Sequence, residues 1–339
     1  MSDTVLLTGI TGFLGGHVAL ELLNSGYTLR GSLRNPQRAD ATRQALEAAG
    51  ADTSRLDFVT LDLTADDGWA NAAEGVRYVI HSASPFVTTM PKDPQELIGP
   101  AVAGTERAFT AARNARVDRI VLTSSTVAIV AGRRGASRLD QLGPDDWANP
   151  EDGRLNAYAT SKVLAERKAW EMAYDGGPEL AVINPGFISG PLLDNDPGTS
   201  GAVIRRILTG DFPMLPKLYI HQIDVRDLAR IHVAAMKDPS AAGKRHLTAF
   251  DTLLLKQAAQ VLVQAFPDRA GSIPTRQAPD WLLRILSLFD GDVRATMNEL
   301  GYNPYLDASR ARRLLCRAPI TGAQSVTDMA RSLIERGLA

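Results

Sequence analysis

A glycine-rich turn close to the start of the chain limits the possible folds more than any other feature of the sequence. The segment Thr8–Gly15 (TGITGFLG) follows a short apolar run, Thr4–Thr8, and opens a stretch in which Leu14, Val18 and Leu22 recur every four residues. Glycines between a first strand and a first helix let backbone N–H groups approach a pyrophosphate at the positive end of the helix. An ordinary glycine-rich turn is the alternative, but the position of this spacing predicts a dinucleotide-binding unit.

The first 185 residues alternate short apolar runs with longer helical patterns. Several of these runs are continuous in Val, Ile and Leu, which is typical of strands buried on both faces of a parallel sheet. Repeated βα units of this kind predict an α/β protein with a Rossmann-type, doubly wound parallel sheet. The candidate strands are Thr4–Thr8, Thr28–Leu33, Leu56–Leu61, Arg77–His81, Arg119–Thr123 and Leu180–Asn184.

The alternation ends at Gly186, after which Gly and Pro cluster in what we expect to be long loops. Helices are expected at Asp224–Met236 and Ser325–Arg336, and a strand at His246–Ala249. We therefore predict a dinucleotide-binding Rossmann domain over residues 1–185, to which 223–250 return, and a smaller C-terminal substrate-binding cap formed by 186–222 and 251–339. Ligands of such sheets bind at the carboxyl edge, which the cap would cover.

Composition narrows the class of partner. The chain of 339 residues has 37 Lys and Arg against 38 Asp and Glu, a balance that disfavours nucleic acid or an anionic membrane as a partner. A single cysteine, Cys316, excludes an internal disulfide, and the five histidines lack metal-ligand spacing, so no metal is expected. Without a signal-like start or a long apolar stretch, a cytoplasmic protein is expected. A homodimer is compatible with the sequence, which does not fix the oligomeric state.

The end of the second predicted strand bears on cofactor choice. An NAD site needs an acid there for the ribose 2′-hydroxyl, whereas an NADP site needs an arginine for the 2′-phosphate. The sequence offers Leu33 and Arg34, with Arg38 close behind, and therefore favours NADP(H) over NAD(H). A solvated surface arginine is the alternative. Asp62 follows the third strand, where it could accept a hydrogen bond from adenine or cap a helix.

A candidate acid–base pair lies in a segment predicted to be helical. Tyr158 and Lys162 are spaced i, i+4, which places both side chains on one helix face. A neighbouring ammonium favours phenolate, which should lower the tyrosine pKa from about 10 and make proton exchange with a substrate oxygen practicable. A serine of Thr123-Ser124-Ser125, at a strand end, could hold the same oxygen. A surface helix pair without catalytic role is the alternative.

These motifs together resemble the extended short-chain dehydrogenase/reductase superfamily, and more narrowly its dihydroflavonol reductase, cinnamoyl-CoA reductase and aldehyde reductase group. The resemblance extends over nearly the whole chain and includes His81–Pro85 (HSASP) and Asn184–Gly186 (NPG). It implies a catalytic triad of Ser125, Tyr158 and Lys162, with Ser124 the less favoured serine. The residues then expected to bind NADP(H) are Thr8, Gly9, Thr11, Gly12, Phe13, Leu14, Gly15, Arg34, Arg38, Asp62, Leu63, Ser82, Ala83, Ser84, Tyr158, Lys162, Pro185, Gly186 and Ile188.

The chain departs from the superfamily at two positions. Ala101 stands where many members have an asparagine, which puts a proton relay through that residue in doubt. Ala128–Val130 (AIV) is apolar where plant flavonoid reductases bind substrate through an asparagine, so a polyphenol substrate is not expected. His221 is expected to face substrate, and aromatic side chains could equally wall the pocket or pack in the core. The expected substrate-binding residues are Phe86, Ser125, Phe187, Tyr219 and His221.

The resulting functional hypothesis is NADPH-dependent, reversible reduction of an aldehyde or ketone to an alcohol, with the proton supplied by Tyr158. A nucleotide-sugar epimerase or dehydratase is one alternative, but such enzymes usually have Val-Tyr-Gly where this chain has Val127-Ala128-Ile129. A non-catalytic NADP-binding sensor is another, although it would be expected to lose the Tyr-x-x-x-Lys spacing. Fold alone does not decide between them.

Overall fold

A seven-stranded parallel sheet forms the centre of the computed structural model, which describes residues 3–85, 91, 93–133, 141–289, 293 and 296–339. Its strand order, β10-β7-β5-β4-β1-β2-β3, reverses direction beside β1, so a topological switch point lies at the carboxyl edge next to the glycine motif. The predicted α/β fold is confirmed. The strands are β1 (Thr4–Thr8), β2 (Thr28–Leu33), β3 (Leu56–Thr60), β4 (Tyr78–His81), β5 (Arg119–Thr123), β7 (Glu179–Pro185) and β10 (Lys244–Thr248).

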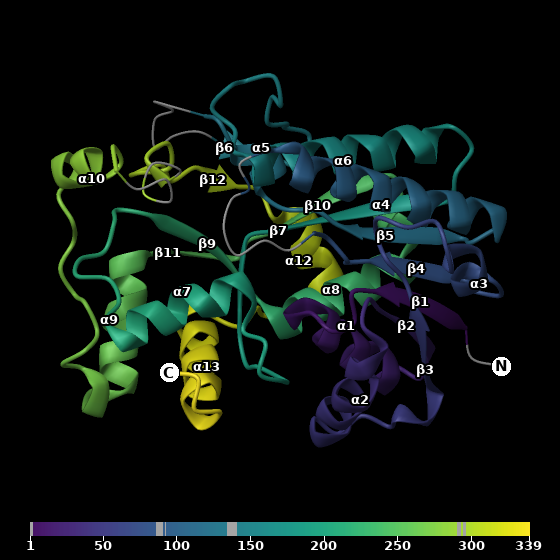
Figure 1. Cartoon of the computed structure of the whole chain (residues 1–339), viewed down its shortest axis with the longest axis horizontal. Helices are drawn as coiled ribbons and strands as arrows, with labels where there is room; N and C mark the ends of the chain where they lie inside the picture. Colours follow the sequence, from purple (N-terminus) through teal and green to yellow (C-terminus); the bar gives the residue numbers. More distant parts are fainter. Residues whose placement is uncertain (1–2, 86–90, 92, 134–140, 290–292, 294–295) are drawn as a thin grey trace.

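Helices cover both faces of this sheet (Figure 1). Strand side chains such as Leu6 and Val79 pack under one helical layer, whereas their neighbours Leu7 and Ile80 pack under the other. This burial on both sides explains the continuous apolar runs of the sequence. The first layer contains α3 (Trp69–Ala73), α4 (Gln95–Asn114) and α6 (Ala157–Tyr174), and the second contains α1 (Phe13–Asn24), α2 (Ala39–Ala48), α8 (Val225–Lys237) and α12 (Ser309–Leu315).

After β2, the proline at position 36 would suit the first position of an α-helix. Pro36 instead begins a short 3-10 turn, Pro36–Arg38, whose entry is capped by the Asn35 side chain accepting the Gln37 N–H at 3.0 Å. The α-helix follows at Ala39. Proline fits the first position of either element because the N–H that it lacks has no partner there. Further 3-10 turns are Thr53–Arg55, Pro239–Ala241 and Pro267–Arg269.

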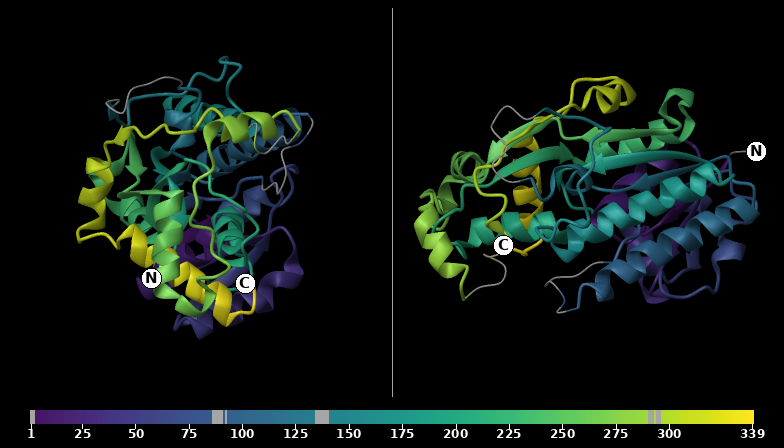
Figure 2. Two further views of the ribbon diagram at one scale, coloured as in Figure 1. Left: turned by 90° about the vertical axis from the view of Figure 1, so that its left-hand side faces the viewer. Right: turned by 90° about the horizontal axis from the view of Figure 1, so that it is seen from above.

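A second, smaller region has its own sheet of order β11-β9-β8 and its own apolar core. Helices α7, α9 and α13 pack against each other at one end of the molecule (Figure 2). Three elements from beyond residue 186 return to the main sheet. β10 pairs with β7, α8 packs against α1, and α12 packs against α8 and β10. The elements of the smaller region are β8 (Phe187–Ser189), α7 (Gly198–Thr209), β9 (Tyr219–Asp224), β11 (Asp251–Leu254), α9 (Leu255–Ala265), α10 (Asp280–Leu286) and α13 (Gly322–Glu335).

A third sheet of two short strands pairs β6 (Gln141–Leu142) with β12 (Tyr305–Leu306) and so links the segment after α5 (Val127–Val130) to the C-terminal part of the chain. Within the described ranges, none of the helices has the length and apolar character that crossing a bilayer requires.

Candidate active site

The glycine motif forms a tight cradle between β1 and α1. Gly9 has a φ of +76°, and a Cβ there would lie 3.0 Å from the backbone of Ala83. A Cβ on Gly15 would lie only 2.0 Å from the Gly9 carbonyl oxygen. Gly12, the residue before α1, has no side chain to cover the first N–H groups of the helix. The cradle thus leaves a helix N-terminus open to an anion, as a pyrophosphate site requires.

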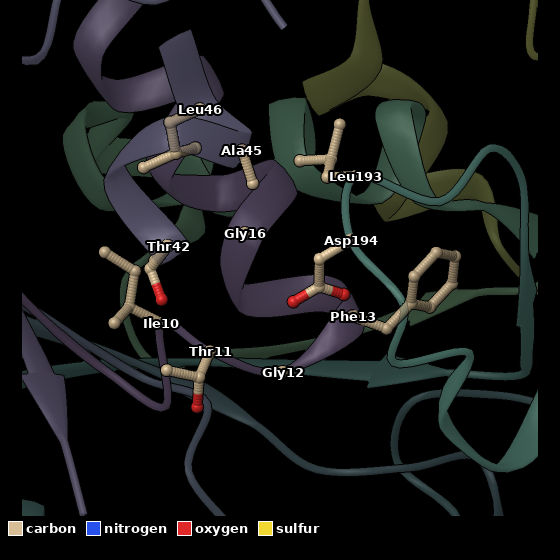
Figure 3. A pocket seen from close by; sticks show the side chains of 10 residues that line it. All are labelled: Ile10, Thr11, Gly12, Phe13, Gly16, Thr42, Ala45, Leu46, Leu193 and Asp194. Carbon is tan, nitrogen blue, oxygen red and sulfur yellow. The ribbon is translucent and has the colours of Figure 1, made fainter. Parts of the chain in front are cut away.

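A hollow lies beside this cradle, between the start of α1, helix α2 and the loop that follows β8 (Figure 3). The Asp194 carboxylate and the Thr42 hydroxyl point toward the glycine turn in this view. The loop thereby brings residues of the smaller region against the predicted cofactor cradle. The residues lining the hollow are Ile10, Thr11, Gly12, Phe13, Gly16, Thr42, Ala45, Leu46, Leu193 and Asp194.

The two arginines predicted to bind a 2′-phosphate differ in their surroundings. Arg34 is exposed at the end of β2 and makes none of the ion pairs found within the described part of the chain. Arg38 pairs with Asp194, at 3.2 Å between Nη2 and Oδ2, with both side chains partly exposed. Arg34 is therefore accessible to a phosphate, whereas Arg38 would have to exchange a carboxylate for it.

Asp62 and Leu63 have local structural roles. The Asp62 carboxylate accepts hydrogen bonds from the N–H and hydroxyl of Thr64, at 2.7 and 2.6 Å, and these hold the pKa of Asp62 below its usual value. The prediction that Asp62 could cap a helix is wrong, because the next helix begins at Trp69 and Asp62 stabilises a turn instead. Leu63 packs against Gly104 of α4.

The segment after β4 is fixed to the glycine motif through Thr8. The Thr8 hydroxyl bonds to His81 Nδ1 at 2.9 Å and accepts the Ala83 N–H at 3.1 Å, and Ser82 donates to the Thr8 carbonyl. Burial, together with the nearby charge of Lys162, lowers the pKa of His81 to about 4, so this histidine is neutral. These bonds bring the backbone of Ala83 against Gly9.

Tyr158 and Lys162 lie in the first turns of α6, which the Asn156 side chain caps by accepting the Ala159 N–H at 2.8 Å. The Lys162 ammonium lies 5.8 Å from the centre of the Tyr158 ring and donates to Ser84 Oγ at 3.1 Å. Ser125, buried just beyond β5, is hydrogen-bonded to the Tyr158 side chain. The structure thus brings together the three residues predicted as a triad and one predicted cofactor contact.

Burial sets the ionisation of the pair. It raises the pKa of Tyr158, and only the hydrogen bond with Ser125 opposes it. It also lowers the pKa of Lys162 to about 8, against the opposing charge of Glu166. The rise at Tyr158 is opposite to the direction expected from the Tyr–Lys spacing, because desolvation of the phenolate outweighs the hydrogen bond with Ser125. The phenol is therefore protonated at neutral pH, the form that can donate a proton.

The two adjacent serines have different partners. Ser124 Oγ donates to the buried carboxylate of Glu166 at 2.6 Å, which leaves Ser125 as the hydroxyl beside Tyr158. The sequence left this choice open and did not single out Glu166. Its position, i+4 from Lys162, continues the helix face of the Tyr–Lys pair and could have identified it.

The turn after β7 brings the smaller sheet against this site. A Cβ on Gly186 would lie 1.9 Å from the carbonyl oxygen of His221, so only glycine allows β9 to approach so closely. The Pro185 carbonyl accepts the Thr126 N–H at 2.9 Å, which holds the turn beside the serines. Ile188 is half-buried on β8 and packs against the main core.

The predicted substrate-binding residues are placed unevenly. His221 Nδ1 bonds to Thr252 Oγ1 at 3.1 Å, and burial lowers the pKa of His221 to about 4. Phe187 packs against the core of the smaller region, Tyr219 is half-buried on β9, and Phe86 lies outside the described residues. The remaining histidines are packed in the fold, as expected, and hydrogen-bonded: His17 to Pro191, His232 to Thr123 and Leu228, and His246 to Ala241.

Comparison with known proteins agrees with this architecture. Residues 5–248 match the model of the NAD-dependent epimerase/dehydratase family. Cinnamoyl-CoA reductase 1 of Petunia hybrida is 33% identical over 278 residues, which span 81% of this chain and 80% of that protein. Tetraketide alpha-pyrone reductase 2 of Arabidopsis thaliana is 35% identical over 247 residues, 70% of this chain and 75% of that protein.

Among solved structures, the yeast methylglyoxal/isovaleraldehyde reductase Gre2 complexed with NADPH superposes with a TM-score of 0.82 over 99% of this chain and 100% of that one. Its 24% sequence identity makes this a likeness of fold. The family match and the plant relatives extend over most of the chain. The protein belongs to the NAD-dependent epimerase/dehydratase family, within the extended short-chain dehydrogenase/reductase superfamily.

Proposed function

We propose that the protein is an NADPH-dependent reductase that converts an aldehyde or ketone reversibly into an alcohol. The observation that supports this most strongly is the convergence of a protonated Tyr158, the Lys162 ammonium and the Ser125 hydroxyl at the carboxyl edge of the sheet. The reductase names of the plant relatives support the same class of reaction. When bound, the nicotinamide supplies the hydride, and the protein supplies position and electrostatics.

In the proposed reaction, side chains of the protein bind the carbonyl oxygen and transfer a proton to it. Ser125 donates a hydrogen bond to this oxygen and orients the carbonyl beside Tyr158. The Tyr158 phenol transfers its proton to the oxygen as negative charge develops there, and the O–H bond of tyrosine becomes the O–H bond of the product alcohol. Lys162 stabilises the phenolate that remains and binds the ribose hydroxyls of the cofactor. In the reverse direction Tyr158 accepts the proton.

The cofactor site fits a dinucleotide. The glycine cradle and the open start of α1 would hold the pyrophosphate, and Ser82–Ser84 would lie beside it. Arg34, with Arg38, would bind the 2′-phosphate, and the absence of an acid at Leu33 disfavours NADH. The nicotinamide would contact the backbone of Pro185, Gly186 and Ile188. We propose that residues 186–222 and 251–339 form the substrate cap, with Phe86, Phe187, Tyr219 and His221 as its contacts.

An NADPH-oxidation screen tests the activity. Wild-type protein and Tyr158→Phe are mixed with NADPH and with aliphatic aldehydes, aryl ketones, β-keto esters and hydroxycinnamoyl thioesters. We expect at least one carbonyl class to be reduced by wild type and hardly by the variant. NADPH oxidation equal in both proteins for every class would reject the assignment. Conversion of a nucleotide sugar without net NADPH oxidation would favour the epimerase alternative.

A further inference from the structure

A buried carboxylate lies directly behind the proposed catalytic residues. Glu166 follows Lys162 by one helical turn, and its side chain is 0% exposed. Its Oε2 accepts hydrogen bonds from Ser124 Oγ at 2.6 Å and Asn184 Nδ2 at 2.9 Å, and its Oε1 accepts from Arg245 Nε at 2.6 Å. One carboxylate therefore joins the end of β5, helix α6, the end of β7 and strand β10.

Arg245, the cation paired with Glu166, connects these strands to another loop. Arg245 is also buried, and its Nη1 donates to the carbonyl oxygens of Pro144, at 2.9 Å, and of Asp146. Its guanidinium carbon lies 3.9 Å from the centre of the Trp147 ring. This loop follows β6, which pairs with β12 near the C-terminus. The network thus links α6, which carries Tyr158 and Lys162, to the loop after β6, whose strand pairs with β12 in the C-terminal part of the chain.

Packing alone does not require such a network. Desolvating two charges is costly, and well-packed apolar side chains often replace a buried ion pair without loss of stability. Here the carboxylate instead receives donors from three strands of the main sheet: Ser124 just after β5, Asn184 near the end of β7 and Arg245 on β10. Ser124 is engaged by Glu166, and the adjacent Ser125 is left beside Tyr158. The Glu166 carboxylate also lies one helical turn from the Lys162 ammonium, which the proposed reaction needs.

On the basis of the proposed reductase function, we propose that Glu166 is a positioning residue of this site. Its carboxylate, held by Arg245, fixes the serine turn so that Ser125 faces Tyr158, and it keeps Lys162 protonated. Ser124 and Asn184 act with it as structural ligands of the carboxylate. None of the three touches the substrate or cofactor.

The charges around Lys162 determine the direction in which its pKa should change when Glu166 is replaced. The groups facing the ammonium are Tyr158 and Glu166 on its own helix, the neutral His81 on β4, and the hydroxyl of Ser84. Burial lowers the pKa of Lys162 to about 8, and Glu166 opposes that shift. Removing the carboxylate should therefore lower the pKa of Lys162 further, so the ammonium is lost at a lower pH. The alkaline limb of the pH profile should move in the same direction.

The same sheet contains a control pair, in which a more exposed carboxylate bonds to a buried arginine far from the site. Glu179 on β7 accepts from Arg119 Nε and Nη2 on β5, at 2.9 and 2.6 Å, at the amino ends of strands whose carboxyl ends lie near Glu166. The Arg119 side chain is only 7% exposed and also donates to three carbonyl oxygens. Glu179→Gln thus removes a carboxylate from a buried arginine without touching the site. Glu166→Gln makes the same change beside it.

The test compares the pH profiles of kcat/KM for wild type, Glu166→Gln and Glu179→Gln, together with NADPH affinity by fluorescence titration over the same pH range. We expect the alkaline limb of Glu166→Gln to move down by about one pH unit, the usual size of an opposite-charge effect. Its loss of NADPH affinity with rising pH should move likewise. The Glu179→Gln profile should match that of wild type even where its melting temperature falls.

A profile of Glu166→Gln that superposes on wild type in both readouts would overturn the proposal, whatever the change in stability. If Glu166→Gln does not fold, the double variant Glu166→Gln/Arg245→Met replaces it, because it leaves no unpaired buried charge. The alkaline limb of its pH profile is then compared with that of wild type in the same way. If wild type shows no carbonyl reduction, the proposed function fails. The pH dependence of NADPH binding then decides the role of Glu166 alone.

Discussion

The two sheets that meet at Gly186 present different surfaces to the site. At the edge of the main sheet several polar side chains are buried and paired, as in the contacts of Thr8 with His81 and of Ser124 with Glu166. On the smaller sheet, Phe187, Tyr219 and His221 are only half-buried. Farther out, Trp281 and Phe289 are 64% and 84% exposed on and just after α10.

This difference indicates that the two regions have different roles, one in catalysis and cofactor binding and the other in substrate choice. Groups held from several elements keep a fixed geometry, which proton transfer and cofactor binding require. Half-buried side chains on short strands and loops can change without disturbing the core, as differing substrates require. Changes at the main-sheet edge should therefore alter the rate for every substrate, whereas changes in the smaller region should alter the ranking of substrates.

The largest effect is expected at the phenol. Tyr158→Phe removes the proton donor, and turnover should fall by roughly 10²–10⁴, the usual contribution of positioned acid–base catalysis. The loss should be similar for all carbonyl substrates, while NADPH affinity and melting temperature stay close to wild type. Steady-state kinetics on two unrelated substrates and a cofactor titration measure this. Turnover within a few-fold of wild type would remove Tyr158 from the mechanism.

Lys162→Ala should slow reduction for all substrates by roughly 10²-fold and weaken cofactor binding. Because the ammonium favours phenolate, its loss should also shift alcohol oxidation, which needs phenolate, to higher pH. The buried lysine has its pKa lowered to about 8, so the unfolded chain binds more protons above that pH. Its contribution makes wild-type stability rise as pH increases from about 8 to about 10.5, and the variant should lose this slope. An unchanged oxidation profile would leave Lys162 with a binding role only.

Cofactor choice should depend on Arg34. A charge-assisted hydrogen bond contributes roughly 1.5–3 kcal/mol, or about 10–150-fold in affinity. Arg34→Ala should remove most of the preference for NADPH by weakening NADPH, with little change for NADH. Adding Leu33→Asp should begin to favour NADH, because an acid repels the phosphate and accepts from the 2′-hydroxyl. Equal affinities of wild type for the two cofactors would show that Arg34 does not bind the phosphate.

The smaller region is tested by His221→Ala. If His221 faces substrate, the variant should change the ratio of kcat/KM between two carbonyl substrates by several-fold, with the NADPH Kd nearly unchanged. Since its pKa is about 4, this histidine should add no titration to the profile near neutral pH. Equal losses for every substrate together with a lower melting temperature would mean that His221 only supports the β9–β11 pair.

The smallest effect is expected where the two regions touch. The Arg38–Asp194 pair is partly exposed, and such pairs contribute only about 0–1 kcal/mol. Asp194→Asn should free Arg38 and tighten NADPH binding by no more than about fivefold, with NADH unaffected. Asp196→Asn on the same loop serves as the control. Weaker NADPH binding in Asp194→Asn would show that the carboxylate supports the site.

How far the sequence could predict this molecule also differs between the two regions. Six of the seven predicted strands of the main sheet occur within one residue of their expected ends, because strands buried on both faces give long apolar runs. The seventh, expected at His246–Ala249, is β10 and begins two residues earlier. In the smaller region β8, β9 and β11 are three to six residues long and only partly buried. Strands of that kind leave no periodic pattern, and no strand is predicted from the sequence at their positions.

The site shows a similar limit. The glycine motif and the Tyr–Lys spacing are local patterns, and sequence spacing alone brings their members together. Glu166 and Arg245 are 79 residues apart, and Arg38 and Asp194 are 156 apart, so only the fold makes them partners. The pKa direction of Tyr158 likewise depends on burial, which spacing does not give.

In the proposed reaction, hydride passes from NADPH to a carbonyl carbon while Tyr158 supplies the proton. The most direct measurement uses NADPH deuterated on both faces of nicotinamide C4, with a carbonyl substrate from the screen, and mass spectrometry of the product. We expect one deuterium on the carbinol carbon for each NADPH oxidised, with product formation nearly abolished in Tyr158→Phe. Product without deuterium, or equal labelling rates in wild type and Tyr158→Phe, would contradict it.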